Sequence, residues 1–115
     1  MVAIYKICAA AEWAGAVQTG RFDGSAVDLK DGFIHFSTSE QLAETAAKYF
    51  SAQANLVLVT VDADRLGSGL KWERARGGSY FPHLYGPLDV ATALSVQELP
   101  DGAARAAFLV DLGVS

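Results

Sequence analysis

Phe33-Ile-His-Phe-Ser-Thr38 is the stretch that decides the fold, because the hydrophobic period of the sequence changes directly after it. Within the stretch, a period of two places Ile34 and Phe36 on one face of a strand. From residue 39 to residue 50 the apolar side chains recur at helical spacing, behind two overlapping capping-box patterns. The sequence therefore predicts a strand followed by a helix over residues 39–50.

The residues before this stretch predict one further strand and one further helix. Residues 2–8 are rich in β-forming side chains, and the Ala-rich residues 9–19 have helical spacing and end at Gly20. Residues 21–31 show no sustained period, so we expect a loop or lid there. Asp31-Gly32 then turns the chain into the deciding stretch.

After the helix, the chain reads mainly as strands. Asn55-Leu-Val-Leu-Val-Thr-Val61 is a continuous β-branched and apolar run, which indicates a central strand covered on both faces. Residues 70–73 and 92–99 are predicted as two more strands. Residues 80–88 are also compatible with a strand. Because two prolines remove backbone donors, we expect this segment at a sheet edge, a strand start or a bulge.

The C-terminal tail allows two interpretations. Residues 103–112 are Ala-rich and compatible with a short helix, whereas residues 106–110 are compatible with a last strand, which we prefer. The order of elements is strand-helix-strand-helix followed by mainly antiparallel strands, so the fold class is α+β. At 115 residues, with 51% hydrophobic and 19% charged residues, we expect one domain over residues 1–115.

Composition also limits the partners. The formal net charge is −4, which argues against binding of a long nucleic acid. No apolar run is long enough to cross a bilayer, so no membrane partner is expected. A single cysteine excludes an internal disulfide and fits a reducing compartment, so we expect a cytoplasmic protein.

Phe33, His35 and Ser37 lie on the strand face opposite Ile34 and Phe36, so an imidazole and a hydroxyl point into the same space if that face opens on a cleft. The alternative is a histidine packed under a loop, with the hydroxyl serving only to cap the next helix. Both interpretations remain open at this point.

Tyr80-Phe-Pro-His-Leu-Tyr85 carries the second histidine, His83, on one face with Phe81 and Tyr85 if the segment is extended. Tyr80 and Tyr85 could stack on a nucleobase or nicotinamide ring, or their segment could be an edge strand whose aromatic rings complete the core. Glu73 could orient a sugar hydroxyl or polarise a nucleophile, or be an ordinary surface acid. The two histidines lie on separate segments without metal-ligand spacing, so no metal site is predicted.

Four motifs together resemble those of an uncharacterised bacterial family, the domain of unknown function family nine hundred fifty-two. They are Ile4-Tyr-Lys-Ile7, Asp31-Gly-Phe-Ile-His-Phe-Ser37, Leu70-Lys-Trp-Glu73 and Phe81-Pro-His-Leu-Tyr-Gly-Pro-Leu88. By fold, that family is grouped with the ADP-ribosyltransferases. The pattern around Ile34-His-Phe-Ser37 is also similar to that of the RNA 2′-phosphotransferases in the same superfamily.

The resemblance implies an ADP-ribosylation-like fold, NAD or an ADP-ribose-type nucleotide as ligand, and a transferase-like activity. It places His35 where the phosphotransferases carry a nucleotide-contacting histidine, and Lys6 where ADP-ribosyltransferases carry a first-strand histidine. The pattern departs at the late strand, where Pro82-His83 stands in place of a glutamate. Glu73 lies one strand too early to be equated with that acid.

The leading hypothesis is a small transferase-like enzyme that binds a small nucleotide-like ligand between the two histidine motifs. Its candidate catalytic residues are His35, His83 and Glu73, and its candidate ligand contacts are Lys6, Ser37, Trp72, Tyr80 and Tyr85. The alternative is a non-catalytic module that binds a metabolite or a protein while both histidines are structural. In a third interpretation, exposed apolar residues mediate self-association.

Overall fold

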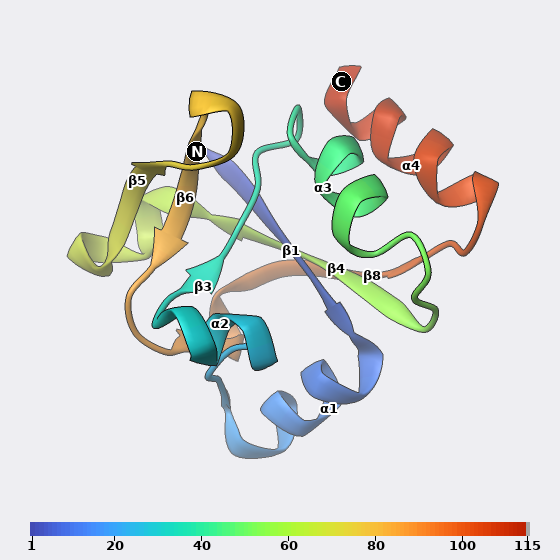
Figure 1. Cartoon of the computed structure of the whole chain (residues 1–115). Helices are drawn as coiled ribbons and strands as arrows, with labels where there is room; N and C mark the ends of the chain where they lie inside the picture. The colour runs from blue at the N-terminus through green and yellow to red at the C-terminus, as the bar shows by residue number, and fades with distance from the viewer. Residues whose placement is uncertain (115) are drawn as a thin grey trace.

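The computed structural model describes residues 1–114, with the side chains of all of them except Arg76 and Val114. The strands are β1 (Ala3–Ala9), β2 (Arg21–Phe22), β3 (Ile34–His35), β4 (Leu56–Asp62), β5 (Leu70–Arg74), β6 (Tyr80–Leu84), β7 (Leu88–Asp89) and β8 (Ala93–Leu99). The α-helices are α1 (Ala10–Thr19), α2 (Ala26–Asp31), α3 (Leu42–Tyr49) and α4 (Ala103–Val114). All strand pairs are antiparallel, which confirms the predicted α+β class (Figure 1).

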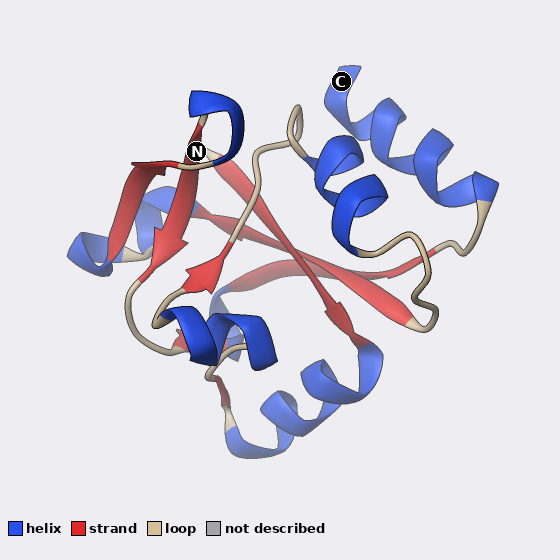
Figure 2. Ribbon diagram, in the orientation of Figure 1, coloured by secondary structure: helices blue, strands red, loops and turns tan. Residues whose placement is uncertain are grey.

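The strands form two three-stranded sheets, β1-β4-β8 and β3-β6-β5, and a short ribbon of β2 with β7. The run predicted as a central strand is β4, which pairs with β1 on one side and β8 on the other. Its residues Leu56 to Val59 are all buried, as expected for a strand covered on both faces. Figure 2 shows helices on both sides of this sheet.

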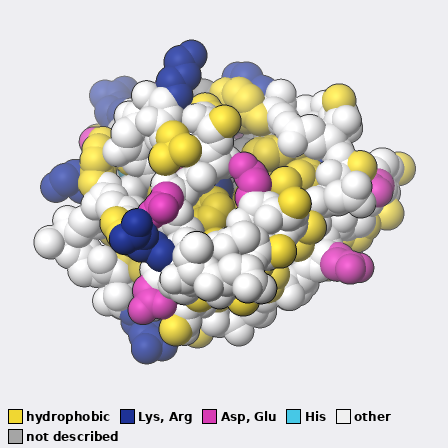
Figure 3. Space-filling view, turned by 90° about the horizontal axis from the view of Figure 1, so that it is seen from below, with side chains coloured by type: hydrophobic (Ala, Val, Ile, Leu, Met, Phe, Trp, Pro, Cys, Tyr) yellow, Lys and Arg dark blue, Asp and Glu magenta, His cyan; other side chains and the backbone are white. Residues whose placement is uncertain are grey.

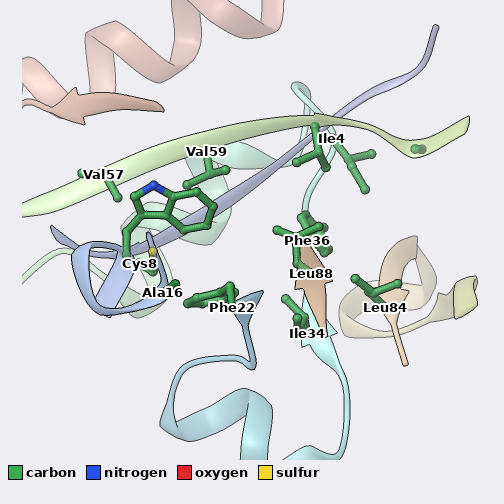
Figure 4. Close-up of a cluster of buried hydrophobic side chains, with 13 residues drawn as sticks. Ile4, Cys8, Ala16, Phe22, Ile34, Phe36, Val57, Val59, Leu84 and Leu88 are labelled. Atoms are coloured by element: carbon green, nitrogen blue, oxygen red, sulfur yellow. The ribbon is translucent and has the colours of Figure 1, made fainter. Parts of the chain in front are cut away.

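Each face of the β1-β4-β8 sheet packs against different helices. On one face, Ile4 and Cys8 form a core with α1 and with the two histidine-bearing segments (Figure 4). On the other face, Ile7 and Leu58 pack against α3 and α4 through Leu42 and Leu109. The alternation of side chains along β1 and β4 therefore supplies two separate cores.

An isolated bridge joins the two sheets. The N–H and C=O of Tyr5 in β1 bond the C=O and N–H of Ser37, at 2.8 and 2.9 Å. Ser37 follows β3, so the chain leaves one sheet and reaches the edge of the other within two residues. The histidine motif is thereby placed beside β1.

The predicted helix over residues 39–50 is present but begins later, at Leu42. The N–H of Thr38 donates to Oε1 of Gln41 at 3.0 Å, and the N–H of Gln41 donates to the C=O of Thr38 at 3.1 Å. The side chain of Gln41 therefore closes a separate turn before the helix, and this turn is not part of the helix. The Thr38-Gln41 capping pattern thus predicts correctly that a helix follows, but it predicts the wrong first residue for that helix.

The prediction of a loop over residues 21–31 is wrong. Arg21–Phe22 forms β2, and Ala26–Asp31 forms α2, which ends at Gly32 with a positive φ of 88°. The N–H of Ser25 donates to Oδ2 of Asp28 at 2.9 Å, so the reciprocal capping spacing Ser-x-x-Asp begins this helix.

The expected edge position of residues 80–88 is also wrong, because β6 is the middle strand of its sheet. The C=O of Pro82 accepts from the N–H of Phe36 at 3.0 Å. The nitrogen of a residue in an antiparallel strand faces the same neighbour as its carbonyl. Pro82 therefore lacks its donor where β3 has just ended, at His35, and only one ladder bond is missing.

The preferred C-terminal strand over residues 106–110 is wrong, since this segment lies within α4. Alanine has the highest helix propensity, and the strand interpretation gave too little weight to the Ala-rich start of the segment. Leu109 is fully buried against α3, and Arg105 is buried between α4 and the loop after α3. The helix is therefore held by packing and by a buried cation.

Candidate functional site

A cavity of about 600 Å³ lies beside the free edge of β1, between α3 and the β3-β6-β5 sheet. It is lined mostly by apolar and aromatic side chains, which suit a flat organic ligand. The lining residues that carry the chemistry are Tyr5, Lys6, Asp31, Phe33, His35, Ser37, Thr45, Tyr49, Phe50, Phe81 and His83.

The two histidines predicted from separate motifs are brought together. His35 pairs with His83 across β3 and β6, and their ring centroids are 5.5 Å apart. The ring of Phe33 stacks on His83 at 4.1 Å and lies 4.5 Å from His35. Both imidazoles line the same cavity, with one aromatic ring in contact with both.

His83 is oriented by a carboxylate on the neighbouring strand. Its Nδ1 lies 2.8 Å from Oε1 of Glu73, and the hydroxyl of Tyr85 donates to the same oxygen at 2.7 Å. The hydrogen bond from Tyr85, followed by the one from His83, lowers the pKa of Glu73, and Glu73 in turn raises the pKa of Tyr85. An ionised Glu73 can only accept, so Nδ1 of His83 carries a proton, and in the neutral imidazole Nε2 carries the lone pair.

No group described by the structure forms a hydrogen bond with Nε2 of His83. His83 is only 6% exposed, so most of the residue is withdrawn from bulk water. A buried imidazole with one nitrogen fixed by a carboxylate and the other unengaged has the arrangement used by acid–base groups.

His35 has a different environment, because both of its nitrogens are occupied. Nδ1 lies 2.6 Å from Oδ1 of Asp28, and Nε2 lies 3.0 Å from Oδ2 of Asp31. Both nitrogens can donate only in the imidazolium form. The ring of His35 is therefore tied to both carboxylates of α2 and leaves no nitrogen for a ligand.

Asp28 is the centre of a buried polar cluster under the cavity. Lys6 Nζ lies 2.7 Å from its Oδ2, and the two side chains are 4% and 0% exposed. Burial would raise the pKa of Asp28, but the hydrogen bond with His35 and the charge of Lys6 outweigh burial and lower it. A buried pair of this kind is held by complete hydrogen bonding, and here Ser25 and the N–H of His35 supply the rest.

The edge of β1 presents an unused backbone pair to the cavity. The N–H and C=O of Tyr5 are directed to Ser37, so those of Ile7, two residues on, are directed to the same side. Within residues 1–114 neither group of Ile7 has a hydrogen-bonding partner, although Ile7 is only 5% exposed and lines the cavity. Buried backbone groups are rarely left without a partner.

The remaining predicted residues are divided between the cavity and other surfaces. Ser37 lines the cavity, is buried, and lies 3.3 Å from the hydroxyl of Thr45. Trp72 lines a separate hollow of about 300 Å³ on the other face of β5. Tyr80 is 57% exposed, and neither Tyr80 nor Tyr85 lines the cavity. Tyr85 reaches the site through its hydroxyl, which donates to Glu73, and through its ring, whose centroid lies 5.2 Å from that of Phe33.

Sequence reasoning missed three contributors: Asp28, Phe33 as the stacking ring, and the backbone of Ile7. The Ser25-x-x-Asp28 spacing was an available signal for the first. Phe33 was placed on the correct strand face but was not considered as a ligand contact. No side-chain pattern could reveal the third, because it depends on where β3 leaves β1.

One face of the surface carries charges of both signs among hydrophobic side chains, without a continuous basic stripe (Figure 3). No helix within residues 1–114 has the length and apolar character needed to span a bilayer. Those same residues contain no cluster of three or more histidine, cysteine, aspartate or glutamate side chains that could hold a metal.

Comparison with known proteins places the chain in a family. The crystal structure of protein CC0527 from Caulobacter crescentus is 53% identical in sequence, with a TM-score of 0.87 over 94% of this chain and 98% of that one. The solution NMR structure of CC0527 is 55% identical, with a TM-score of 0.84 over 96% of both chains. No curated protein matches. Residues 7–96 match the family described as "Protein of unknown function (DUF952)", and the chain belongs to this family.

Proposed function

We propose that the cavity binds a nucleotide of the NAD or ADP-ribose type, with the flat, carboxamide-bearing nicotinamide of NAD as the best-fitting group, and that His83 is the acid–base group of a transferase-like reaction. The observation that carries the proposal is the 2.8 Å contact between Nδ1 of His83 and Glu73, which leaves Nε2 for the ligand. An ADP-ribosylation-like fold, implied by the sequence resemblance, is part of the same proposal.

The unused backbone pair of Ile7 supports the choice of ligand. One N–H and one C=O of a single residue, side by side on a strand edge, complement a group that offers an acceptor and a donor together. A primary carboxamide such as that of nicotinamide is such a group. The cavity volume of about 600 Å³ and its aromatic lining fit a ring with an attached sugar.

In the proposed reaction, the ADP-ribosyl group of NAD passes from nicotinamide to the oxygen of an acceptor hydroxyl or of water. The bond between the ribose carbon and the nicotinamide nitrogen breaks, and nicotinamide leaves with the electron pair. The acceptor oxygen bonds the same carbon, and its proton passes to Nε2 of His83. Glu73 stabilises the imidazolium that forms.

His35 is a positioning residue in this proposal, because both of its nitrogens are engaged by α2. Lys6 and Ser37 form the polar floor. Trp72 and Tyr80 are not ligand contacts in this proposal, because neither lines the cavity.

The experiment is a thermal-shift and calorimetric comparison with nicotinamide, NAD and ADP-ribose. A ligand at a hundredfold its dissociation constant adds about 2.7 kcal/mol, or a rise in melting temperature on the order of 10 °C. His83→Ala should abolish this rise, while Trp72→Phe, a matched aromatic change in the separate hollow, should retain it. The absence of a shift with all three compounds in the wild-type protein would refute the proposed ligand class.

The alternative function is a binding module without turnover. The occupation of both nitrogens of His35 favours this alternative, because only His83 then has a nitrogen available for chemistry. The enzyme and the binding module predict different results when the wild-type protein is compared with the Glu73→Gln variant. Glu73→Gln should retain NAD binding in both cases. Release of nicotinamide from NAD by the wild-type protein, and its loss in Glu73→Gln, would support catalysis; binding without release would support the module.

A further inference from the structure

We infer that α4, which lies outside the family-matched residues 7–96, sets the position of the α3 wall of the cavity through Arg105. Phe50 and Gln53, which follow α3, line the cavity on this side. The positioning itself rests on the contacts of Arg105 alone. Only its consequence for ligand binding rests on the proposed function.

Arg105 is 4% exposed and binds the backbone of two other segments. Its Nη1 donates to the C=O of Phe50 at 2.6 Å, and its Nη2 donates to the C=O of Gln53 at 2.7 Å. Nε donates to the C=O of Pro100 at 2.9 Å, and Asp101 lies 3.1 Å from Nη2. One guanidinium therefore fixes the first turn of α4 and the segment that closes the cavity.

The chemistry of the side chain matters as well as its charge. A guanidinium is planar and presents five donors in a fixed fork, so it can serve several carbonyls in different directions at once. A lysine ammonium is a compact point charge on a flexible stem and cannot hold the same set in place. The three carbonyls and the carboxylate therefore specify arginine at this position.

The other end of α4 contacts the start of the α3 segment. A Cβ built on Gly113 would lie 3.2 Å from the carbonyl oxygen of Ser39, so the helix approaches this backbone closely. Arg105 bonds the end of the segment that contains α3, and Gly113 lies close to the start of this segment. A shift of the segment as a whole would therefore disturb its packing against α4 at one end or the other.

The experiment compares Arg105→Met and Arg105→Lys with Leu88→Ala, a destabilising core variant whose side chain does not line the cavity. Native-state hydrogen exchange is measured for the amides of residues 49–54, and nicotinamide binding is measured by calorimetry. Relative to Leu88→Ala, the two Arg105 variants should increase exchange of these amides about tenfold or more while exchange within β4 changes equally in all three. Nicotinamide affinity should fall about tenfold in the Arg105 variants and remain near the wild-type value in Leu88→Ala.

The result that would overturn the inference is equal exchange at residues 49–54 in the Arg105 and Leu88 variants. Because exchange requires no ligand, it decides the inference even if the wild-type protein binds none of nicotinamide, NAD and ADP-ribose, a result that would refute the proposed function alone. If Arg105→Met does not fold, Arg105→Lys and Gly113→Ala keep the test available. Gly113→Ala should increase exchange near residues 39–42 and leave residues 49–54 protected.

Discussion

Asp28 and Lys6, 22 residues apart in the sequence, form an ion pair of 2.7 Å whose side chains are almost completely withdrawn from water. This pair joins α2 to β1 and lies beneath both the cavity and His35. Because each charge is buried, neither partner is expected to be replaceable alone. The following predictions test this pair, the His83 cluster and the core around them.

Asp28→Asn should lower the free energy of unfolding by about 3–5 kcal/mol, because it leaves the Lys6 ammonium buried without its counter-charge. Urea unfolding at neutral pH measures the change. The double variant Lys6→Met/Asp28→Asn removes the stranded charge and should recover part of the loss. A double variant less stable than Asp28→Asn would contradict the role of the pair.

The free energy of unfolding should fall at acid pH because the pKa of Asp28 is lowered in the folded protein. The folded-state pKa lies below the unfolded value of about 3.9, so the unfolded chain binds more protons over the interval between them. The contribution of Asp28 is therefore complete above about pH 5 and is lost as the pH falls below about 4. Urea unfolding curves between neutral and acid pH should show a steeper loss in the wild-type protein than in Asp28→Asn, and parallel losses would refute this assignment.

Glu73→Gln should lower the pKa of Tyr85. The carboxylate accepts the hydrogen bond of the neutral phenol and repels the tyrosinate, so its charge holds the pKa of Tyr85 above the ordinary value of about 10. The ultraviolet absorbance of tyrosinate during an alkaline titration measures the change. Subtracting the titration of Tyr85→Phe in each background isolates this residue from the other three tyrosines.

Cys8 should be unreactive toward thiol reagents in the folded protein. Burial raises the pKa of this thiol to about 12, so very little thiolate exists near neutral pH. Modification by iodoacetamide should follow the rate of unfolding and become rapid in urea. Fast labelling under native conditions would show that the core face of β1 opens more readily than its packing implies.

Periodicity predicted the elements that pack against one partner over many residues. The apolar run of β4 and the helical spacing in α3 both gave the correct type of structure, because a buried stripe must repeat to be covered. In α2 the same reasoning failed, since six residues are too few to show a period. Its only local signal was the spacing of Ser25 and Asp28.

The candidate site was predictable in part. Alternation along a strand correctly placed His83 and Phe81 on one face, and both line the cavity. The same alternation puts Tyr80 and Trp72 on the opposite face, so their selection as ligand contacts disregarded it. The occupation of both nitrogens of His35 could not be predicted, because both of its partners, Asp28 and Asp31, lay in a segment that was expected to be a loop.

The proline in the middle of β6 has an effect on the shape of the protein that extends beyond its own strand. Pro82 has no amide hydrogen to donate to the C=O of Phe36, so the pairing of β3 with β6 stops there. The chain then crosses to β1, where Ser37 pairs with Tyr5. The two sheets consequently diverge at this crossing instead of continuing as one surface. The cavity that both histidines line lies between the two diverging sheets. It opens at the position of Pro82, which has no amide hydrogen.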